Sequence, residues 1–153
     1  MSQKVENFTA IDQNGEVFDL YEALEKSAVL LYFYPKDMTS GCTVQAEGFR
    51  DIKDELYAAN VRIVGVSKDS AASHTKFIEK HHLNFDLLAD TQTELCQQFG
   101  CWVKKSMYGR EYMGIERATF FINQDAVIMK EWRGVKPRLS AEQVTEFIQA
   151  LSS

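Results

Sequence analysis

Residues 32–50 of this chain read YFYPKDMTSGCTVQAEGFR and combine the end of a strand with the start of a helix. The run Ala28–Tyr34 is unbroken, apolar and rich in aromatic residues, and its length suits a strand that is covered on both faces. Pro35 has a fixed φ and no N–H, so it ends that strand. The polar segment Lys36–Gly41 then predicts a turn.

Cys42 follows this turn at the point where a helical pattern begins. The apolar residues Phe49, Ile52 and Leu56 recur at helical spacing, which predicts a helix from Cys42 to about Ala59. The first turn of a helix has unpaired N–H groups and the positive end of the helix dipole. A thiol placed there is stabilised in its anionic, nucleophilic form.

The rest of the chain alternates strand and helix patterns on either side of this segment. Before it, Asn14-Gly15 lies between two short segments, which predicts a hairpin over residues 5–20 at one edge of the fold, followed by a helical turn over Tyr21–Lys26. After it, the expected elements are strands at Val61–Ser67, Asp86–Ala89, Ala118–Ile122 and Val127–Trp132, and helices opening at Asp69–Ser70 and at the capping patterns Thr91–Glu94 and Ser140–Gln143.

This order of elements predicts an α/β protein in which helices cover both faces of a central sheet. Residues 103–116 carry many charges, two glycines and no clear period, and we interpret them as a long loop. The 153 residues suit one domain, and no repeat or linker divides them.

Composition and charge exclude several classes of function. The chain is 45% hydrophobic and 25% charged, as is usual for a soluble globular protein. A net charge of −5 argues against nucleic acid as the main partner, because binding to phosphates needs a basic face. No secretory pattern opens the sequence and no window suits a bilayer span, so we expect a cytoplasmic protein without a membrane partner.

The three cysteines, Cys42, Cys96 and Cys101, are an odd and scattered set that does not match a secreted disulfide framework. Cys96 and Cys101 are separated by four residues and are far in sequence from the histidines, so they lack the paired spacing of a structural zinc site. We therefore expect free thiols, no metal and no cofactor.

The three histidines are interpreted as exposed helix residues. His74 and His81 are seven residues apart, which differs from the spacing of four in a helical zinc site. Neither they nor His82 supports a cysteine–histidine pair. Trp102 precedes the expected loop, and we interpret it as a packing residue that could also wall a pocket.

The run FYPKDMTSGCTVQAEGFRD, residues 33–51, resembles the active-site signature of peroxiredoxins. Within them it resembles the PrxQ or bacterioferritin-comigratory-protein subfamily, whose segment reads roughly F-Y-P-K-x-x-T-x-G-C-T. GIERATFFIN, residues 114–123, resembles the subfamily's segment with the active-site arginine, and the similarity extends over about residues 14–132. The resemblance implies a thioredoxin fold and a thiol peroxidase that reduces hydrogen peroxide and organic hydroperoxides.

The resemblance also implies roles for four residues. Cys42 would attack the peroxide and become a sulfenic acid. Thr39 would place its hydroxyl beside the sulfur, and Arg117 would hold the thiolate and a peroxide oxygen together. Pro35 would shape and shield the pocket without a competing N–H. Without the resemblance, these residues would be interpreted as an inert buried cysteine, a turn threonine, an exposed arginine and a strand terminator.

The usual resolving cysteines of the subfamily are absent from this chain. Many members carry one five residues after the catalytic cysteine, where this chain has Glu47, and others carry it in the next helix, where this chain has Ile78. Cys101, beside the expected loop, and Cys96 are the possible resolving residues within the chain. We favour resolution by an external thiol over Cys101, and Cys101 over Cys96.

Two classes of function fit these residues. The first is a monomeric thiol peroxidase that thioredoxin, glutaredoxin or a small thiol recycles. The second is a non-enzymatic redox sensor or partner-binding module, in which oxidation of Cys42 changes a surface that another protein binds. Rapid oxidation that repeats with added reductant indicates the enzyme, whereas one slow stoichiometric oxidation indicates the sensor.

Overall fold

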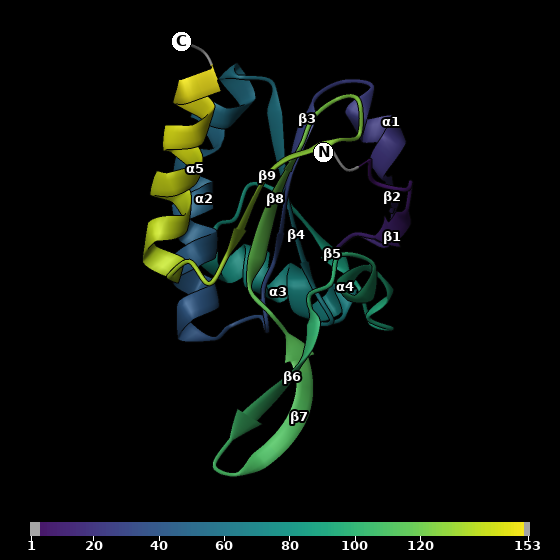
Figure 1. Ribbon diagram of the computed structural model, residues 1–153, viewed down its shortest axis with the longest axis vertical. Coiled ribbons are helices and arrows are strands. Elements are labelled where there is room, and N and C mark those ends of the chain that lie inside the picture. Colours follow the sequence, from purple (N-terminus) through teal and green to yellow (C-terminus); the bar gives the residue numbers. More distant parts are fainter. Residues whose placement is uncertain (1–3, 152–153) are drawn as a thin grey trace.

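The computed structural model describes residues 4–151 (Figure 1). Its centre is a five-stranded mixed sheet with the strand order β5-β4-β3-β8-β9. The parallel part consists of β3 (Ala28–Phe33), β4 (Val61–Ser67) and β5 (Asp86–Ala89). On the other side of β3, β8 (Ala118–Ile122) is antiparallel to both of its neighbours, β3 and β9 (Ile128–Arg133).

β3 is the central strand because its sequence is apolar at every position, and all of its residues are buried. Leu31 and Phe33 point to one face of the sheet, whereas Leu30 and Tyr32 point to the other, as the period of two in a strand requires. Burial on both faces gives the sheet two apolar cores. We name them the Phe33 core and the Cys42 core after one member of each.

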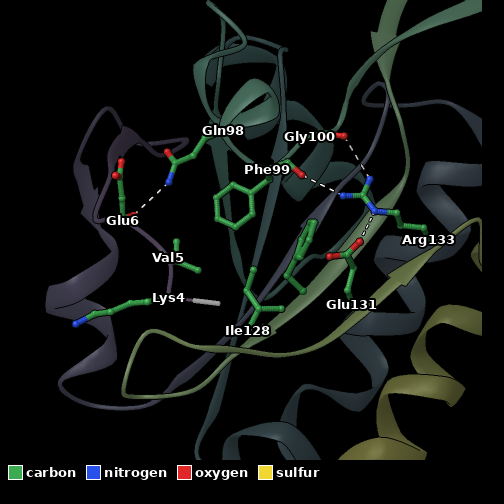
Figure 2. Close-up of a pocket in the computed structure, with 10 residues that line it drawn as sticks. Lys4, Val5, Glu6, Gln98, Phe99, Gly100, Ile128, Glu131 and Arg133 are labelled. Atoms are coloured by element: carbon green, nitrogen blue, oxygen red, sulfur yellow. Dashed lines mark hydrogen bonds and ion pairs between the residues drawn. The ribbon is translucent and has the colours of Figure 1, made fainter. Parts of the chain in front are cut away.

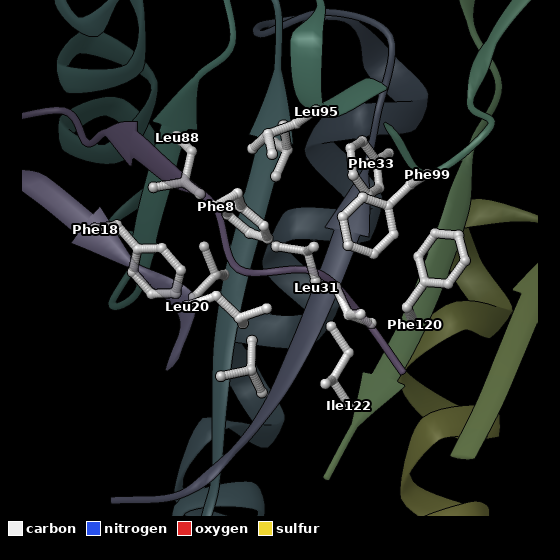
Figure 3. Close-up of a cluster of buried hydrophobic side chains, with 14 of the residues drawn as sticks. Phe8, Phe18, Leu20, Leu31, Phe33, Leu88, Leu95, Phe99, Phe120 and Ile122 are labelled. Carbon is white, nitrogen blue, oxygen red and sulfur yellow. The ribbon is translucent and has the colours of Figure 1, made fainter. Parts of the chain in front are cut away.

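Helices cover both faces of the sheet, which confirms the predicted α/β architecture. The Cys42 core lies under three helices, α2 (Ser40–Ala58), α3 (Ala71–His81) and α5 (Pro137–Leu151). The Phe33 core (Figure 3) is covered by two short helices and a hairpin, α1 (Leu20–Leu24), α4 (Glu94–Gln98) and the strands β1 (Thr9–Ile11) and β2 (Val17–Asp19). Within residues 4–151 no helix combines the length and the apolar character that a bilayer span needs.

The segment between β3 and α2 folds as the sequence predicts. Tyr34 still donates its N–H to the carbonyl of Val66 at 3.1 Å, and Pro35 then ends this pairing. α2 begins at Ser40, two residues before the predicted start, so Cys42 does lie in its first turn. The end of β3 therefore places a cysteine at a helix N-terminus.

The predicted N-terminal hairpin is confirmed. β1 and β2 pair antiparallel, and Gly15 in the turn has a φ of 77°, which glycine adopts without a steric penalty. The carboxylate of Asp12 accepts hydrogen bonds from the N–H groups of Asn14 and Glu16 at 2.8 and 3.0 Å. A bridge between Asp12 and Leu88 places this hairpin beside the β5 edge of the sheet.

Residues 103–116 form a second hairpin, so the prediction of a loop is wrong. β6 (Trp102–Met107) and β7 (Arg110–Ile115) pair antiparallel and project from one end of the molecule (Figure 1). Tyr108 and Gly109 join them, with φ values of 53° and 77°, as a two-residue hairpin turn requires. Most of both strands is exposed on its two faces, so no alternation of apolar and polar residues marks them in the sequence.

α4 and α5 confirm the helices that were predicted near the capping patterns at Thr91 and Ser140, but neither pattern starts its helix, so both predicted starts are wrong. Before α4, Thr93 has a left-handed backbone and makes no side-chain cap. The carboxylate of Asp90 instead accepts from the N–H groups of two residues in the first turn of α4, at 3.1 and 2.9 Å. α5 begins at Pro137, because proline suits the first helical position, where its missing N–H has no partner to lose.

Candidate active site

Cys42 is buried in the first turn of α2, with 2% of its surface exposed. That turn contains no acidic side chain, and the side chain of the N-cap residue Thr39 makes no capping hydrogen bond. Among residues 4–151, no side-chain carboxylate therefore caps the N–H groups of this turn. The helix N-terminus is thus available to stabilise a negative charge on the sulfur of Cys42.

The guanidinium of Arg117 contacts this sulfur. Its Nη2 donates to Cys42 Sγ at 3.4 Å, and its Nη1 donates to Oε1 of Gln45. Arg117 comes directly before β8, whose first residue, Ala118, is paired with Phe33 at the end of β3. The antiparallel pairing of β3 with β8 therefore brings the arginine to the cysteine.

Gln45 holds the guanidinium of Arg117 in place, a role that the sequence analysis missed. The side chain is 1% exposed, and its Nε2 donates to Ser140 Oγ at 3.2 Å. Ser140 Oγ in turn donates to the carbonyl of Lys136 at 3.5 Å. Gln45 lies three residues after Cys42 and so on the same side of α2, which is the signal that could have identified it.

Thr39 and Pro35 lie in the segment that connects β3 to α2, before Cys42. Thr39 is exposed, and its hydroxyl donates to the carbonyl of Lys36 at 2.8 Å rather than to the sulfur of Cys42. The turn places that carbonyl three residues back, within reach of the hydroxyl. Pro35 is half-buried directly after the last paired residue of β3.

A second cation lies near the site on the hairpin. Burial lowers the pKa of Lys105 on β6, and the positive charge of Arg117 lowers it further. The negative charges of Cys42 and Glu116 oppose this shift. The hairpin, predicted to be a loop, therefore contributes to the electrostatics around the cysteine.

Cys96 and Cys101 lie on the opposite side of the sheet from Cys42. Both are fully buried members of the Phe33 core, whereas Cys42 belongs to the other core. All three are free thiols. Burial raises the pKa of Cys101 to about 12 and raises the pKa of Cys96 still further. Both groups are therefore neutral thiols at physiological pH, and the sheet separates them from Cys42.

These raised pKa values predict a loss of stability at alkaline pH. In the unfolded chain a thiol ionises above about pH 8.5, whereas the buried Cys101 keeps its proton up to about pH 12. Deprotonation thus favours the unfolded state. The free energy of unfolding has its highest value below pH 8 and falls as the pH rises. We expect a loss of about 1–2 kcal/mol per thiol between pH 8 and 10.

Urea unfolding of the parent and of Cys101→Ala at several pH values in this range measures the effect. The variant has a lower stability at pH 8 because it leaves a cavity, but we expect its free energy of unfolding to fall less steeply with pH. Curves with the same slope for both proteins would contradict the burial of a neutral thiol at position 101.

The interpretation of the histidines as exposed is wrong for His74. Its side chain is fully buried, and both ring nitrogens have hydrogen-bond partners. His81 is half-buried, with Nδ1 3.4 Å from the carboxylate of Glu47, and His82 is exposed. Helical spacing alone does not distinguish the buried face of α3 here, because histidine is found both in cores and on surfaces.

A surface pocket of about 490 Å³ lies over the Phe33 core (Figure 2). Phe99 and Phe120 line it, and the guanidinium of Arg133 at its rim donates to the carbonyls of Phe99 and Gly100 and to the carboxylates of Glu116 and Glu131. This pocket is across the sheet from Cys42. In residues 4–151 no group of three or more His, Cys, Asp or Glu side chains is arranged to hold a metal ion.

A mixed sheet with helices on both faces, and a buried thiol at a helix N-terminus against a guanidinium, define a thiol-based oxidoreductase. A family model described as the AhpC/TSA family matches residues 1–131. Peroxiredoxin Bcp of Bacillus subtilis is 42% identical over 151 residues, which cover 99% of this chain and 94% of that protein. A putative peroxiredoxin bcp of Coxiella burnetii is 44% identical over 136 residues, 89% of each chain.

Solved structures agree with these relatives. A cysteine mutant of PrxQ from Xylella fastidiosa superposes with a TM-score of 0.94 at 30% identity, covering 100% of this chain and 97% of that one. The bacterioferritin comigratory protein of Xanthomonas campestris, studied for alkyl peroxide reduction, gives a TM-score of 0.89 at 32% identity. The match covers 97% of this chain and 98% of that one. The chain therefore belongs to the AhpC/TSA family and, within it, to the peroxiredoxins of the PrxQ or bacterioferritin-comigratory type. It has the thioredoxin fold of that family and is a thiol peroxidase.

Proposed function

We propose that Cys42 is the thiol that reduces hydrogen peroxide and organic hydroperoxides, and that Arg117 assists it directly. The observation that carries this assignment is the 3.4 Å contact between Arg117 Nη2 and Cys42 Sγ at the N-terminus of α2. A fixed cation and a helix N-terminus together stabilise the thiolate, which is the nucleophilic form of cysteine.

The reaction is a displacement at the peroxide oxygen. The thiolate of Cys42 attacks the terminal oxygen of R–O–O–H, so that an S–O bond forms and the O–O bond breaks. The leaving oxygen takes a proton and departs as water or an alcohol, and the sulfur remains as a sulfenic acid. Negative charge moves from the sulfur to the leaving oxygen, and the forked guanidinium of Arg117 can donate to both atoms.

Thr39 and Pro35 complete this proposal. The hydroxyl of Thr39 is exposed and is held by the single acceptor Lys36 O, so rotation about one bond can turn it towards a bound peroxide. Pro35 has no N–H that could bind the reacting oxygens in competition with the thiolate.

We further propose that an external thiol, from thioredoxin, glutaredoxin or a small molecule, resolves the sulfenic acid on Cys42. Cys96 and Cys101 are poor candidates because the sheet separates them from Cys42 and burial keeps both protonated. A disulfide needs sulfur atoms about 2.05 Å apart and an attacking thiolate. The positions of the two residues therefore support the external route.

Intact-mass measurement after one equivalent of peroxide tests this route. We expect the protein to gain one oxygen and keep it until an added thiol removes it, and excess peroxide to add a second oxygen. Cys101→Ser and Cys96→Ser should cycle with thioredoxin at the parent rate. Loss of two hydrogens, with a peptide that links Cys42 to Cys101 or Cys96, would show instead that the chain resolves itself.

We also propose that the protein acts as a cytoplasmic monomer built from one domain. Three free thiols suit a reducing compartment, and the sheet and its helices share two continuous cores. The oligomeric state can be measured by native mass spectrometry on the same samples, and the location by cell fractionation. Relatives named peroxiredoxin, matched over nearly the whole chain, favour repeated turnover over a non-enzymatic sensor.

A further inference from the structure

A buried cluster of polar side chains lies beneath the loop that connects β3 to α2. Its centre is Asp37, which is 4% exposed although it carries a carboxylate. Oδ1 of Asp37 accepts from the hydroxyl of Tyr34 at 2.6 Å, and Oδ2 accepts from the hydroxyl of Ser73 at 2.8 Å. His74 Nδ1 lies 2.8 Å from the same Oδ2. The cluster joins the end of β3, the loop and α3.

Both ring nitrogens of His74 are hydrogen-bonded. Its Nε2 lies 2.9 Å from the carbonyl of Leu88 in β5, and a carbonyl can only accept, so Nε2 carries a proton. Its Nδ1 lies 2.8 Å from Oδ2 of Asp37, so a proton lies between the imidazole and the carboxyl group. Asp37 and His74 therefore form a buried hydrogen-bonded pair.

This pair fixes a loop that needs support. The N–H of Asp37 donates to Oδ2 of Asp69 at 2.8 Å, and Ser67 donates to the same oxygen at 2.8 Å, so the end of β4 also holds the loop. Met38, the next residue, has a φ of 66°, which is unfavourable for a residue other than glycine. Such a backbone persists where its surroundings overdetermine it. Thr39 and the start of α2 follow immediately.

We propose that Asp37 and His74 are positioning residues of the peroxidase site, which as a buried hydrogen-bonded pair fix the loop that sets Thr39 and the first turn of α2. The pair touches no reacting atom and acts through the loop. Loss of either side chain leaves the other buried without its hydrogen-bond partner, and the loop and the sulfur of Cys42 then shift relative to Arg117. This inference rests on the assignment of Cys42 as the reacting thiol.

Two measurements on the same variants separate positioning from a purely structural role. The proteins are the parent, Asp37→Asn, His74→Gln and the double variant. The control is His82→Asn, which changes an exposed histidine at the C-terminal end of α3. We expect each single variant to lower the second-order rate of Cys42 oxidation by at least about tenfold under conditions where it is fully folded. The double variant should lose much less than the product of the two, because each single change already breaks the one hydrogen bond that the pair shares. His82→Asn should match the parent.

Unchanged oxidation rates in folded single variants, with only a lower free energy of unfolding, would overturn the proposal. So would losses that multiply in the double variant, since the two residues would then act independently.

Nitrogen-15 NMR of the histidine rings provides a measurement that needs no variant to fold and no reactive Cys42. In the parent, we expect the proton that joins His74 Nδ1 to Asp37 to exchange slowly with water, because both side chains are buried. Rapid exchange of this proton would refute the buried pair. A confirmed pair with an unreactive Cys42 would instead count against the catalytic assignment alone.

Discussion

Replacement of Cys42 by serine should abolish peroxide turnover, with a fall of at least about a thousandfold. Serine is nearly the same size as cysteine, and position 42 lies in the first turn of a long helix, so we expect the fold to remain intact. The hydroxyl does not ionise near neutral pH and cannot supply the nucleophilic anion that the thiol supplies. Peroxide consumption with excess reductant, measured beside the circular dichroism spectrum of each protein, gives the comparison.

Cys101→Ser is the matched control for this substitution. It makes the same chemical change at another buried cysteine, but in the core on the opposite side of the sheet. We expect it to lower stability, because it buries a hydroxyl in an apolar site, and to leave turnover per folded molecule unchanged. Turnover near the parent rate in Cys42→Ser would refute the assignment of Cys42.

The second large effect is expected for Arg117→Ala, which should slow the oxidation of Cys42 by about 100- to 1,000-fold. The substitution removes the cation that contacts the sulfur at 3.4 Å and leaves Oε1 of the buried Gln45 without its partner. Both the thiolate and the charge that develops on the leaving oxygen lose stabilisation. Stopped-flow oxidation with hydrogen peroxide measures the rate, and the ultraviolet absorbance of the thiolate measures its fraction.

Two further variants show which property of Arg117 matters. Arg117→Lys keeps the charge but loses the forked donors that reach Cys42 and Gln45 together, so we expect an intermediate rate. Arg138→Ala removes an exposed arginine from α5 and should react like the parent. An oxidation rate and a thiolate fraction that both stay unchanged in Arg117→Ala would mean that Arg117 has a structural role.

Local pattern was sufficient to predict the elements around the cysteine. β3 is recognisable because every position is apolar, and α2 because its apolar residues recur at helical spacing. Pro35 marks the boundary between them, and the chemistry of a thiol at a helix N-terminus follows from that boundary alone. These features depend on residues that are neighbours in the chain, so their physical causes are visible in the sequence.

The hairpin β6–β7 shows the limit of local pattern. Most of its two strands is exposed on both faces, and without a buried face there is no alternation of apolar residues to detect. The helix starts show the same limit. Asp90 caps α4 although several residues of loop separate it from the helix, and α5 starts at Pro137. The patterns at Thr91 and Ser140 match the sequence of a capping box, but neither starts a helix in the folded chain.

Contacts between distant residues were decided by the tertiary structure. Arg117 reaches Cys42 across 75 residues because β8 pairs with β3, and Gln45 reaches Ser140 across 95 because α5 lies against α2. The sequence likewise does not show on which side of the sheet a thiol lies, although the sheet separates Cys101 from Cys42. The sequence alone therefore determines which groups can react and where the reactive thiol lies in its helix. The packing of strands and helices determines which other groups meet it, because charge and hydrogen bonding act over a few ångströms of space, whatever the separation along the chain.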